Sequence, residues 1–341
     1  MTKPVALVTG AAGFLGSHLV DYLIGSLGME VVALDDLSGG SKDNVHKKAR
    51  FVKGSVVDQR LVDRLFAKHR FRYVYHLAAY AAEGLSHFIR RFNYTNNLIG
   101  SINLINASVN GKVERFVFTS SIAVYGAGQV PMTEETLPKP EDPYGVAKLA
   151  VEQDLAAAHE MFGLDYVVFR PHNVYGERQN LGDKYRNVVG IFMRQILGGE
   201  DITIFGDGEQ RRAFTYVGDI IPGIARSALT DEAKNKVFNV GSDHHASVNE
   251  LAEIVIRSLG KSAQIRHVEA RNEVKVAYSD HSRFKAVFKD APETSLEEGI
   301  RRMADWARTA PVRKSGDFSN IEIATKLPPV WVTKPRPKKS R

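Results

Sequence analysis

Short runs rich in apolar residues recur along the first half of the chain and are separated by segments with helical periodicity. The runs cover 5–8, 31–34, 50–53, 73–76 and 115–120, of which the first two are entirely apolar. Apolar runs are typical of buried parallel strands, and the alternation of strands with helices predicts a doubly wound parallel sheet, an α/β fold. This regularity ends near residue 172. We expect one domain over 1–172, a segment returning to it near 215–240, and a smaller second domain mainly over 173–310.

The first apolar run leads directly into a glycine-rich turn of the form T-G-x-x-G-x-x-G, which begins at Thr9. Gly10 permits the turn, Gly13 lets the backbone approach a pyrophosphate, and Gly16 lets the next helix pack close to the sheet. The free N–H groups at the start of that helix would face the phosphates. The spacing therefore predicts a dinucleotide site, with glycines that serve packing alone as the alternative.

Two acidic residues, Asp35 and Asp36, end the second apolar run about twenty residues after the last glycine of the turn. A carboxylate at this position binds the hydroxyl groups of a ribose and repels a 2′-phosphate. No arginine follows before Arg50. The sequence therefore favours NAD over NADP, although the same carboxylates can also cap a turn.

Tyr144 and Lys148 stand four positions apart, behind an Asp142-Pro143 pair that is typical of a helix start. Four positions are about one helical turn, so both side chains lie on one face. Tyrosine, with a reference pKa of about 10, needs a neighbouring positive charge to act as a base at neutral pH. The spacing is compatible with such a pair, and also with a packed ring beside a solvated amine.

Residues 4 to 308 resemble the extended short-chain dehydrogenases/reductases that act on nucleotide sugars, and are most similar to the UDP-galactose 4-epimerases. The resemblance rests on several motifs in the family's order, at 9–16, 34–38, 75–79, 97–100, 119–126, 144–148, 170–176 and 205–214. It implies a Rossmann-type NAD-binding domain followed by a substrate domain. One departure is Ser55, where the family commonly has an aspartate near the adenine. Adenine binding is then expected to depend on Asp58 or on the backbone at Val56.

The resemblance implies an NAD site along the strand ends. The residues expected to contact the cofactor are Gly10, Gly13, Phe14, Leu15, Asp35, Asp36, Ser38, Val56, Asp58, Leu77, Ala78, Ala79, Asn97, Tyr144, Lys148 and His172. It also implies a catalytic set of Ser121, Tyr144 and Lys148, in which Tyr144 removes the proton of the sugar 4-hydroxyl. Ser121, rather than its neighbour Ser120, would bridge the 4-oxygen to Tyr144.

The substrate site implied by the resemblance comprises Ser121 and Tyr144 beside the sugar, with further residues around the diphosphate. Asn173 would contact the diphosphate, while Arg212 and Arg271 would neutralise its charges. Arg211 is the alternative to Arg212. Tyr278 aligns with a gate beside the sugar and would leave little room for an N-acetyl group; packing within the domain core is its alternative role.

The type of reaction depends on two positions after the catalytic serine. Family dehydratases and decarboxylases carry acidic residues where this chain has Ile122 and Ala123. An Ile-Ala pair cannot transfer protons, so we expect 4-epimerisation of UDP-glucose and UDP-galactose through a 4-keto intermediate. The alternatives are a UDP-glucuronate 4-epimerase, a nucleotide-4-ketosugar reductase and a non-catalytic NAD-binding scaffold.

Composition limits the other classes of function. The 341-residue chain is 43% hydrophobic and has no cysteine, which excludes disulfides and thiolate metal sites; no metal site is expected. Most of the net charge of +7 comes from residues 326–341, which include no acidic residue. Six basic residues lie there: Lys326, Lys334, Arg336, Lys338, Lys339 and Arg341. The rest of the chain is nearly neutral, so we expect no nucleic-acid partner.

The sequence also lacks the signals of a membrane protein. No apolar run reaches the ~20 residues of a membrane span, and the N-terminus is too polar for a signal peptide. A cytoplasmic enzyme without a membrane partner is therefore expected.

Residues 311–341 form a C-terminal extension in this interpretation. Its basic, proline-rich end is expected to be disordered, with binding to an anionic surface or partner as the alternative. Phe318, Ile321 and Ile323 are expected to dock on the protein.

The segments after Asn97 and Tyr144 are predicted to form long helices with apolar faces. These faces comprise Leu98, Ile102, Leu104 and Ile105 on the first helix and Val146, Leu149 and Leu155 on the second. The family resemblance implies that these helices pair across a two-fold axis in a homodimer. Packing against the sheet could explain the same apolar residues.

Overall fold

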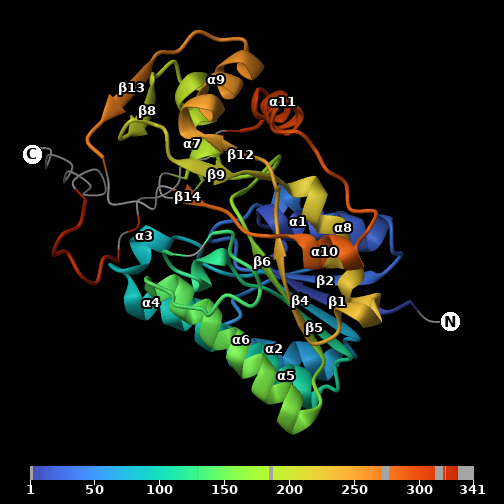
Figure 1. The fold of residues 1–341 in the computed structure, drawn as a ribbon. Helices are drawn as coiled ribbons and strands as arrows, with labels where there is room; N and C mark the ends of the chain where they lie inside the picture. The colour runs from blue at the N-terminus through green and yellow to red at the C-terminus, as the bar shows by residue number, and fades with distance from the viewer. Residues whose placement is uncertain are drawn as a thin grey trace, which may run out of the picture.

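The fold is built on a central sheet of seven strands, all parallel, in the order β11-β6-β5-β4-β1-β2-β3 (Figure 1). The computed structural model describes residues 3–128, 130–183, 187–270, 276–311, 318 and 320–328. The strands are β1 Val5–Thr9, β2 Glu30–Asp35, β3 Arg50–Lys53, β4 Tyr73–His76, β5 Arg115–Thr119, β6 Tyr166–Pro171 and β11 Lys236–Val240. The predicted doubly wound sheet is confirmed, and each predicted apolar run forms one of its strands.

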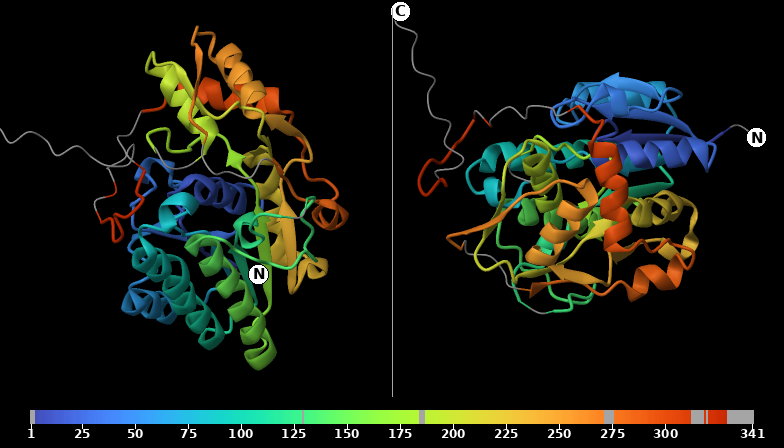
Figure 2. Two further views of the ribbon diagram at one scale, coloured as in Figure 1. Left: turned by 60° about the vertical axis from the view of Figure 1, so that its left-hand side comes forward. Right: turned by 90° about the horizontal axis from the view of Figure 1, so that it is seen from above.

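Helices cover both faces of this sheet (Figures 1 and 2). On one face lie α1 (Phe14–Gly25) and α8 (Val217–Arg226), and on the other lie α2 (Gln59–Lys68), α5 (Gly100–Asn110) and α6 (Pro143–Phe162). Successive side chains of a strand point to opposite faces. In β1, Ala6 and Val8 therefore enter one core while Leu7 enters the other. Burial on both faces explains why the inner strands are mostly apolar, whereas the edge strand β3 has exposed charged ends, Arg50 and Lys53.

A second layer lies over the carboxyl ends of the strands (Figure 1). Its helices are α7 (Val188–Leu197), α9 (Val248–Leu259) and α11 (Leu296–Ala307), and its short strands are β7 Val174–Tyr175, β8 Ile202–Phe205, β9 Arg211–Ala213, β10 Thr215–Tyr216, β12 His245–Ser247, β13 Ile265–Val268 and β14 Val276–Ala277. The larger apolar core runs without interruption from α1 and α8 to α7, α9 and α11. This continuity fixes the second layer above the sheet.

Shorter helices complete the fold: α3 (Glu83–Ser86) and α4 (Arg90–Tyr94) follow β4, and α10 (Ser282–Val287) packs near β11. None of the helices in the described ranges is long and apolar enough to cross a membrane.

The C-terminal extension docks on the segment that follows β4. Phe318 and Ile321 join an apolar cluster there, as predicted, and the Phe318 ring lies 5.5 Å from that of Tyr80. The Glu322 carboxylate accepts hydrogen bonds from the backbone N–H of Arg91 at 2.7 Å and of Phe92 at 2.8 Å. Ile323 is 41% exposed, so its predicted packing is wrong. The basic end, 329–341, lies outside the described residues.

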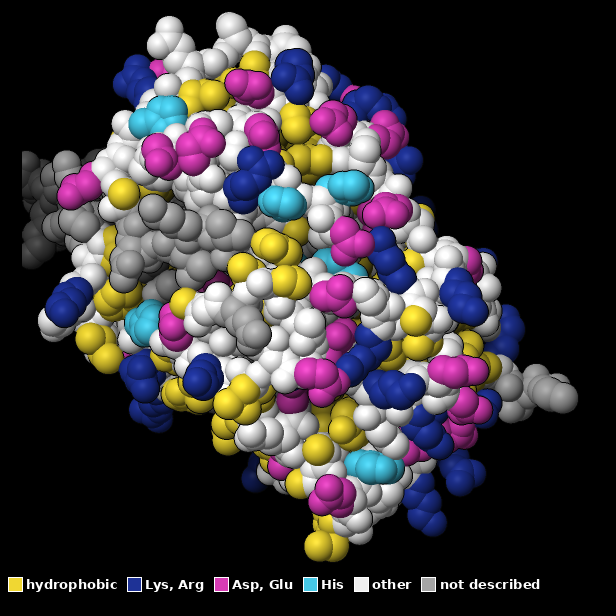
Figure 3. Space-filling model, in the orientation of Figure 1, with side chains coloured by type: hydrophobic (Ala, Val, Ile, Leu, Met, Phe, Trp, Pro, Cys, Tyr) yellow, Lys and Arg dark blue, Asp and Glu magenta, His cyan; other side chains and the backbone are white. Residues whose placement is uncertain are grey.

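The apolar residues expected at a dimer interface divide into two groups. Leu104, Ile105 and Leu155 are buried against the sheet, which is the intramolecular alternative. Val146, in contrast, is exposed on α6, and other large apolar side chains on or next to these two helices are exposed as well: Ile99, Met161 and Phe162. Hydrophobic side chains are visible along the lower edge of the molecule, where α6 lies (Figure 3). A part of the α5–α6 surface therefore remains open to a partner.

Candidate active site

A cavity of about 920 Å³ lies between the carboxyl ends of the sheet strands and the second layer. Ligands of open α/β sheets bind at this edge, where the strand order reverses. The structure brings most of the predicted site residues together here: Gly10, Gly13, Phe14, Leu15, Asp35, Asp36, Ser38, Val56, Leu77, Ala78, Ala79, Ser121, Tyr144, Lys148, His172, Asn173 and Arg212 all line the cavity.

The glycine turn forms one wall of the cavity. Gly10 has a φ of 69°, in the left-handed region that favours glycine. A Cβ atom on Gly16 would lie 2.0 Å from the carbonyl oxygen of Gly10, so no larger residue fits between the turn and α1. No side chain in the described part of the protein caps the start of α1. Its first N–H groups can therefore bind a pyrophosphate, and the turn fits the phosphates of a dinucleotide.

Asp35 joins the end of β2 to this turn. Its carboxylate accepts hydrogen bonds from the N–H of Ala12 at 2.9 Å and of Leu37 at 2.7 Å. Burial raises the pKa of Asp35 above its usual value, and the hydrogen bonds from these N–H groups offset only a part of that rise. Asp36 accepts a bond from the N–H of Ser38 at 2.8 Å. Both carboxylates also line the cavity, so turn capping and a place beside a ribose are compatible here.

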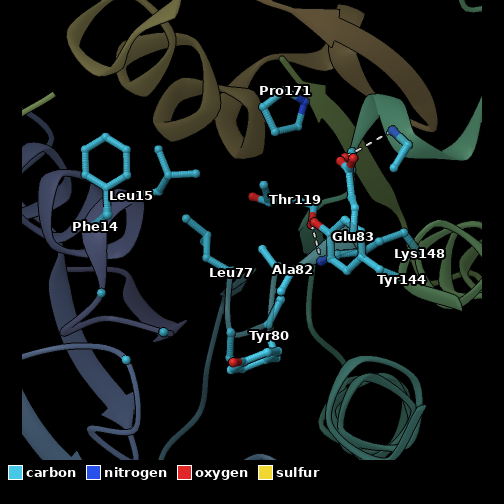
Figure 4. A pocket seen from close by; sticks show the side chains of 18 of the residues that line it. Phe14, Leu15, Leu77, Tyr80, Ala82, Glu83, Thr119, Tyr144, Lys148 and Pro171 are labelled. Carbon is cyan, nitrogen blue, oxygen red and sulfur yellow. Dashed lines mark hydrogen bonds between the residues drawn. The ribbon is translucent and has the colours of Figure 1, made fainter. Parts of the chain in front are cut away.

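Tyr144 and Lys148 project from one face of α6, as their spacing predicted (Figure 4). Asp142 caps this helix by accepting a bond from the N–H of Gly145 at 3.0 Å. The Lys148 ammonium nitrogen lies 5.7 Å from the centre of the Tyr144 ring and donates to the carbonyl of Thr119 at 2.8 Å. Burial lowers the pKa of Lys148 to about 7. The pair is thus placed for proton transfer at the cavity wall.

The two candidate serines have different surroundings. Ser120 is bonded to Glu152, which forms a buried ion pair with Arg170. The Ser121 hydroxyl accepts a bond from the N–H of Ala123 at 3.1 Å and is open to the cavity. The geometry therefore favours Ser121 as the residue that meets a substrate, while Ser120 holds a buried network.

The neighbouring arginines also separate. Arg212 lines the cavity, whereas Arg211 turns toward Glu250, 3.3 Å away. Asn173, with a φ of 37°, donates from its amide to the carbonyl of Ala213 at 3.2 Å, at the edge of the cavity. Arg271 lies outside the described residues.

Asp58 and Asn97 are not among the described residues that line the cavity. The Asp58 carboxylate caps α2 by accepting a bond from the N–H of Leu61 at 3.0 Å, so the expectation that it contacts adenine is not supported. Asn97 is fully buried, and its side-chain amide is bonded to the backbone of Tyr80 at 2.7 and 3.1 Å. It positions the segment after β4 rather than facing a cofactor. Val56 does line the cavity.

The structure does not place Tyr278 at the expected gate. Its ring stacks on His245, with the ring centres 5.3 Å apart, and it is not among the described residues that line the cavity. Tyr278 directly follows β14, which pairs with one edge of β9, while His245 belongs to β12, which pairs with the other edge of β9.

His172 has a distinctive environment at the cavity wall. Both of its ring nitrogens are buried without a hydrogen-bond partner among the described residues. Burial, followed by the charges of His281 and Arg212, lowers the pKa of His172 to about 3, so the ring is neutral. A neutral imidazole offers one donor and one acceptor, which fits a carboxamide such as that of nicotinamide.

Sequence reasoning missed Glu83. It begins α3 and lines the same cavity as Tyr144 and Lys148 (Figure 4). No motif marks this position, because the residue reaches the cavity only through the fold of the segment after β4.

Comparisons with known proteins agree with this geometry. Residues 6–241 match the NAD dependent epimerase/dehydratase family. The chain is 34% identical over 305 residues to a putative UDP-glucose 4-epimerase of Methanocaldococcus jannaschii, covering 89% of this chain and 98% of that protein. The crystal structure of UDP-glucose 4-epimerase with UDP-glucose from Thermotoga maritima is similar, with a TM-score of 0.84, 34% identity and coverage of 89% and 98%.

A second similar structure contains the cofactor. It is UDP-glucuronic acid 4-epimerase from Bacillus cereus with UDP-glucuronic acid and NAD, with a TM-score of 0.81, 29% identity and coverage of 89% of this chain and 98% of that one. The glycine turn, the acidic end of β2 and the Tyr144–Lys148 pair fit such a cofactor. This chain is therefore an NAD-dependent enzyme that belongs to the NAD dependent epimerase/dehydratase family.

Proposed function

We propose that the enzyme interconverts UDP-glucose and UDP-galactose at C4 through a 4-keto intermediate. The observation that carries the proposal is the convergence of Ser121, Tyr144 and Lys148 on a cavity that also contains a dinucleotide turn and Arg212. Similarity to proteins that act on or bind UDP-glucose supports this substrate.

NAD, when bound, supplies the acceptor and donor of the hydride. The glycine turn and Asp35 would hold its nucleotide end, and Lys148 and His172 would lie beside the nicotinamide end. Tyr144, as a phenolate, accepts the proton of the sugar 4-hydroxyl. Lys148 stabilises that phenolate through its positive charge.

The remaining residues hold the substrate while C4 reacts. The Ser121 hydroxyl donates to the 4-oxygen and keeps it near Tyr144. Arg212 pairs with the diphosphate, so that the 4-keto sugar can turn while its nucleotide end stays bound. Tyr144 then returns the proton to the 4-oxygen, and the cycle ends with the opposite configuration at C4.

A second candidate is 4-epimerisation of UDP-glucuronate. It is favoured by the similarity to the Bacillus cereus enzyme bound to UDP-glucuronic acid and NAD. The same catalytic residues would serve both reactions, since the two sugars differ only at C6.

Proton NMR of the purified, NAD-loaded enzyme tests the proposal. The enzyme would be incubated separately with UDP-glucose, UDP-galactose and UDP-glucuronate in the presence of added NAD+, and the absorbance of NADH would be followed in parallel. We expect the 4-epimer to form without net formation of NADH. Stoichiometric formation of NADH together with a 4-keto sugar would indicate a net oxidoreductase instead, and bound NAD without turnover of any of these sugars would indicate a non-catalytic scaffold.

A further inference from the structure

The segment after β4 places Glu83 at a fixed position relative to the catalytic tyrosine. Glu83 is the first residue of α3, which packs against α6. The Ser86 hydroxyl donates to the carbonyl of Glu83 at 2.5 Å and accepts a bond from the N–H of Tyr144 at 3.3 Å. One hydroxyl therefore links the backbone of Glu83 to that of Tyr144, so the two residues are held together at the cavity wall.

The Glu83 carboxylate forms no hydrogen bond or ion pair with another residue in the described part of the chain. Glu83 is an exposed residue that lines the cavity, and many protein atoms lie around its carboxylate. Desolvation by these atoms, and then the charge of Asp142, raise the pKa of Glu83 to about 7, while Arg212 lowers it. An acidic group partly removed from water without a partner costs folding free energy. Glu83 therefore has no evident role in stabilising the fold.

A bound sugar would supply the missing partners. Sugar hydroxyls are hydrogen-bond donors, and bonds to a carboxylate are roughly twice as strong as bonds between neutral groups. A uronic acid would instead bring a further carboxylate into a cavity whose described lining has three basic side chains, Lys148, Arg178 and Arg212, and six acidic ones: Asp35, Asp36, Glu83, Glu141, Asp142 and Asp183. Like charges placed together disfavour binding.

We propose that Glu83 is a sugar-binding residue that selects a neutral hexose over a uronic acid. It accepts hydrogen bonds from the hexose hydroxyls and repels the uronate carboxylate. This inference rests on the proposed function, because it assumes that the sugar of a nucleotide sugar occupies the cavity beside Tyr144.

The test compares two substrates in matched variants of the full chain loaded with NAD. The variants are Glu83→Gln, which removes the charge and keeps the shape, and Glu83→Ala, with Glu253→Gln as a control for the loss of a carboxylate on the exposed face of α9. We expect wild type to favour UDP-glucose over UDP-glucuronate in kcat/KM. Glu83→Gln should shift this ratio toward UDP-glucuronate by about tenfold, which corresponds to ~1.4 kcal/mol. The control should leave the ratio unchanged.

Two results would overturn the inference while the epimerase function stands: a wild-type preference for UDP-glucuronate, or an unchanged ratio in both Glu83 variants. If wild type turns over neither sugar, the proposed function fails. Calorimetric affinities of UDP-glucose and UDP-glucuronate for wild type and Glu83→Gln then test Glu83 separately. A shift of the affinity ratio toward UDP-glucuronate supports the inference, and an unchanged ratio contradicts it.

Discussion

In the proposed mechanism, Tyr144 and Lys148 have separable contributions to the reaction, because only Tyr144 exchanges a proton with the sugar. Tyr144→Phe removes the hydroxyl and keeps the ring. We expect turnover to fall by about 10²- to 10⁴-fold, the usual contribution of a general acid–base group, while NAD stays bound. Lys148→Ala should reduce both turnover and the NAD content of the purified protein. The kinetics and the bound NAD of each variant check this, and near-wild-type turnover of Tyr144→Phe would contradict the mechanism.

Glu83 should also leave a signature in the pH dependence of stability. Its pKa rises from 4.5 in the unfolded chain to about 7 in the folded protein, through desolvation and then the charge of Asp142. The folded state thus binds the Glu83 proton more tightly than the unfolded chain does. The stability that this proton contributes is fully present below pH 4.5 and is lost as the pH rises through about 7. Glu83→Gln cannot ionise. Its melting temperature, relative to ligand-free wild type, should therefore be higher at pH 8 than at pH 5.

The melting temperatures of Glu83→Gln and wild type, measured side by side across this pH range, check the prediction. A difference between them that stays constant over the range would show that the Glu83 pKa is not raised in the folded protein.

Individual site residues were predictable where a motif fixed their place on the backbone. Tyr144, Lys148 and Ser121 follow directly from such motifs, and the structure places all three at the cavity. The positions of Tyr278 and Glu83 could not be predicted from motifs. Their side-chain directions depend on how β14 pairs and on how the segment after β4 folds. Those contacts join segments far apart in the chain, and no local pattern encodes them.

Among the elements, the first five strands of the central sheet were predictable one by one, while β6, β11 and the strands of the second layer were not. The inner strands of the sheet bury both faces and so carry their own apolar signal, although the edge strand β3 is only partly buried. In the second layer, β7 and β10 are only two residues long each, and they pair with one another across about 40 intervening positions. Such short strands form through tertiary contacts and leave no periodic pattern.

The docked C-terminal segment contributes a helix cap to another element. The Glu322 carboxylate accepts bonds from two N–H groups at the start of α4, where the helix dipole also favours negative charge. Loss of such a cap typically costs about 0.5–2 kcal/mol. Glu322→Ala should therefore lower the melting temperature by a few degrees. Ile323→Ala, which truncates an exposed neighbour, should change it little, and equal effects of the two would argue against a cap.

At the scale of the whole molecule, the exposed apolar surface around Val146 and Ile99 suggests a homodimer. We predict that light scattering at micromolar concentration gives a dimer mass. Val146→Asp should shift the protein toward the monomer, since it places a charge in the proposed interface. Glu253→Gln, on α9 in the second layer, is the control. A monomer mass for wild type would refute the dimer.

In the proposed reaction, oxidation and reduction at a single carbon of the sugar invert its configuration. The most direct test follows deuterium placed at C4 of UDP-galactose during turnover by the NAD-loaded enzyme, using NMR and mass spectrometry. We expect UDP-glucose that retains the deuterium at C4, because in this mechanism the hydrogen removed from C4 returns to C4. Replacement of the deuterium by solvent hydrogen, or no formation of UDP-glucose, would contradict it.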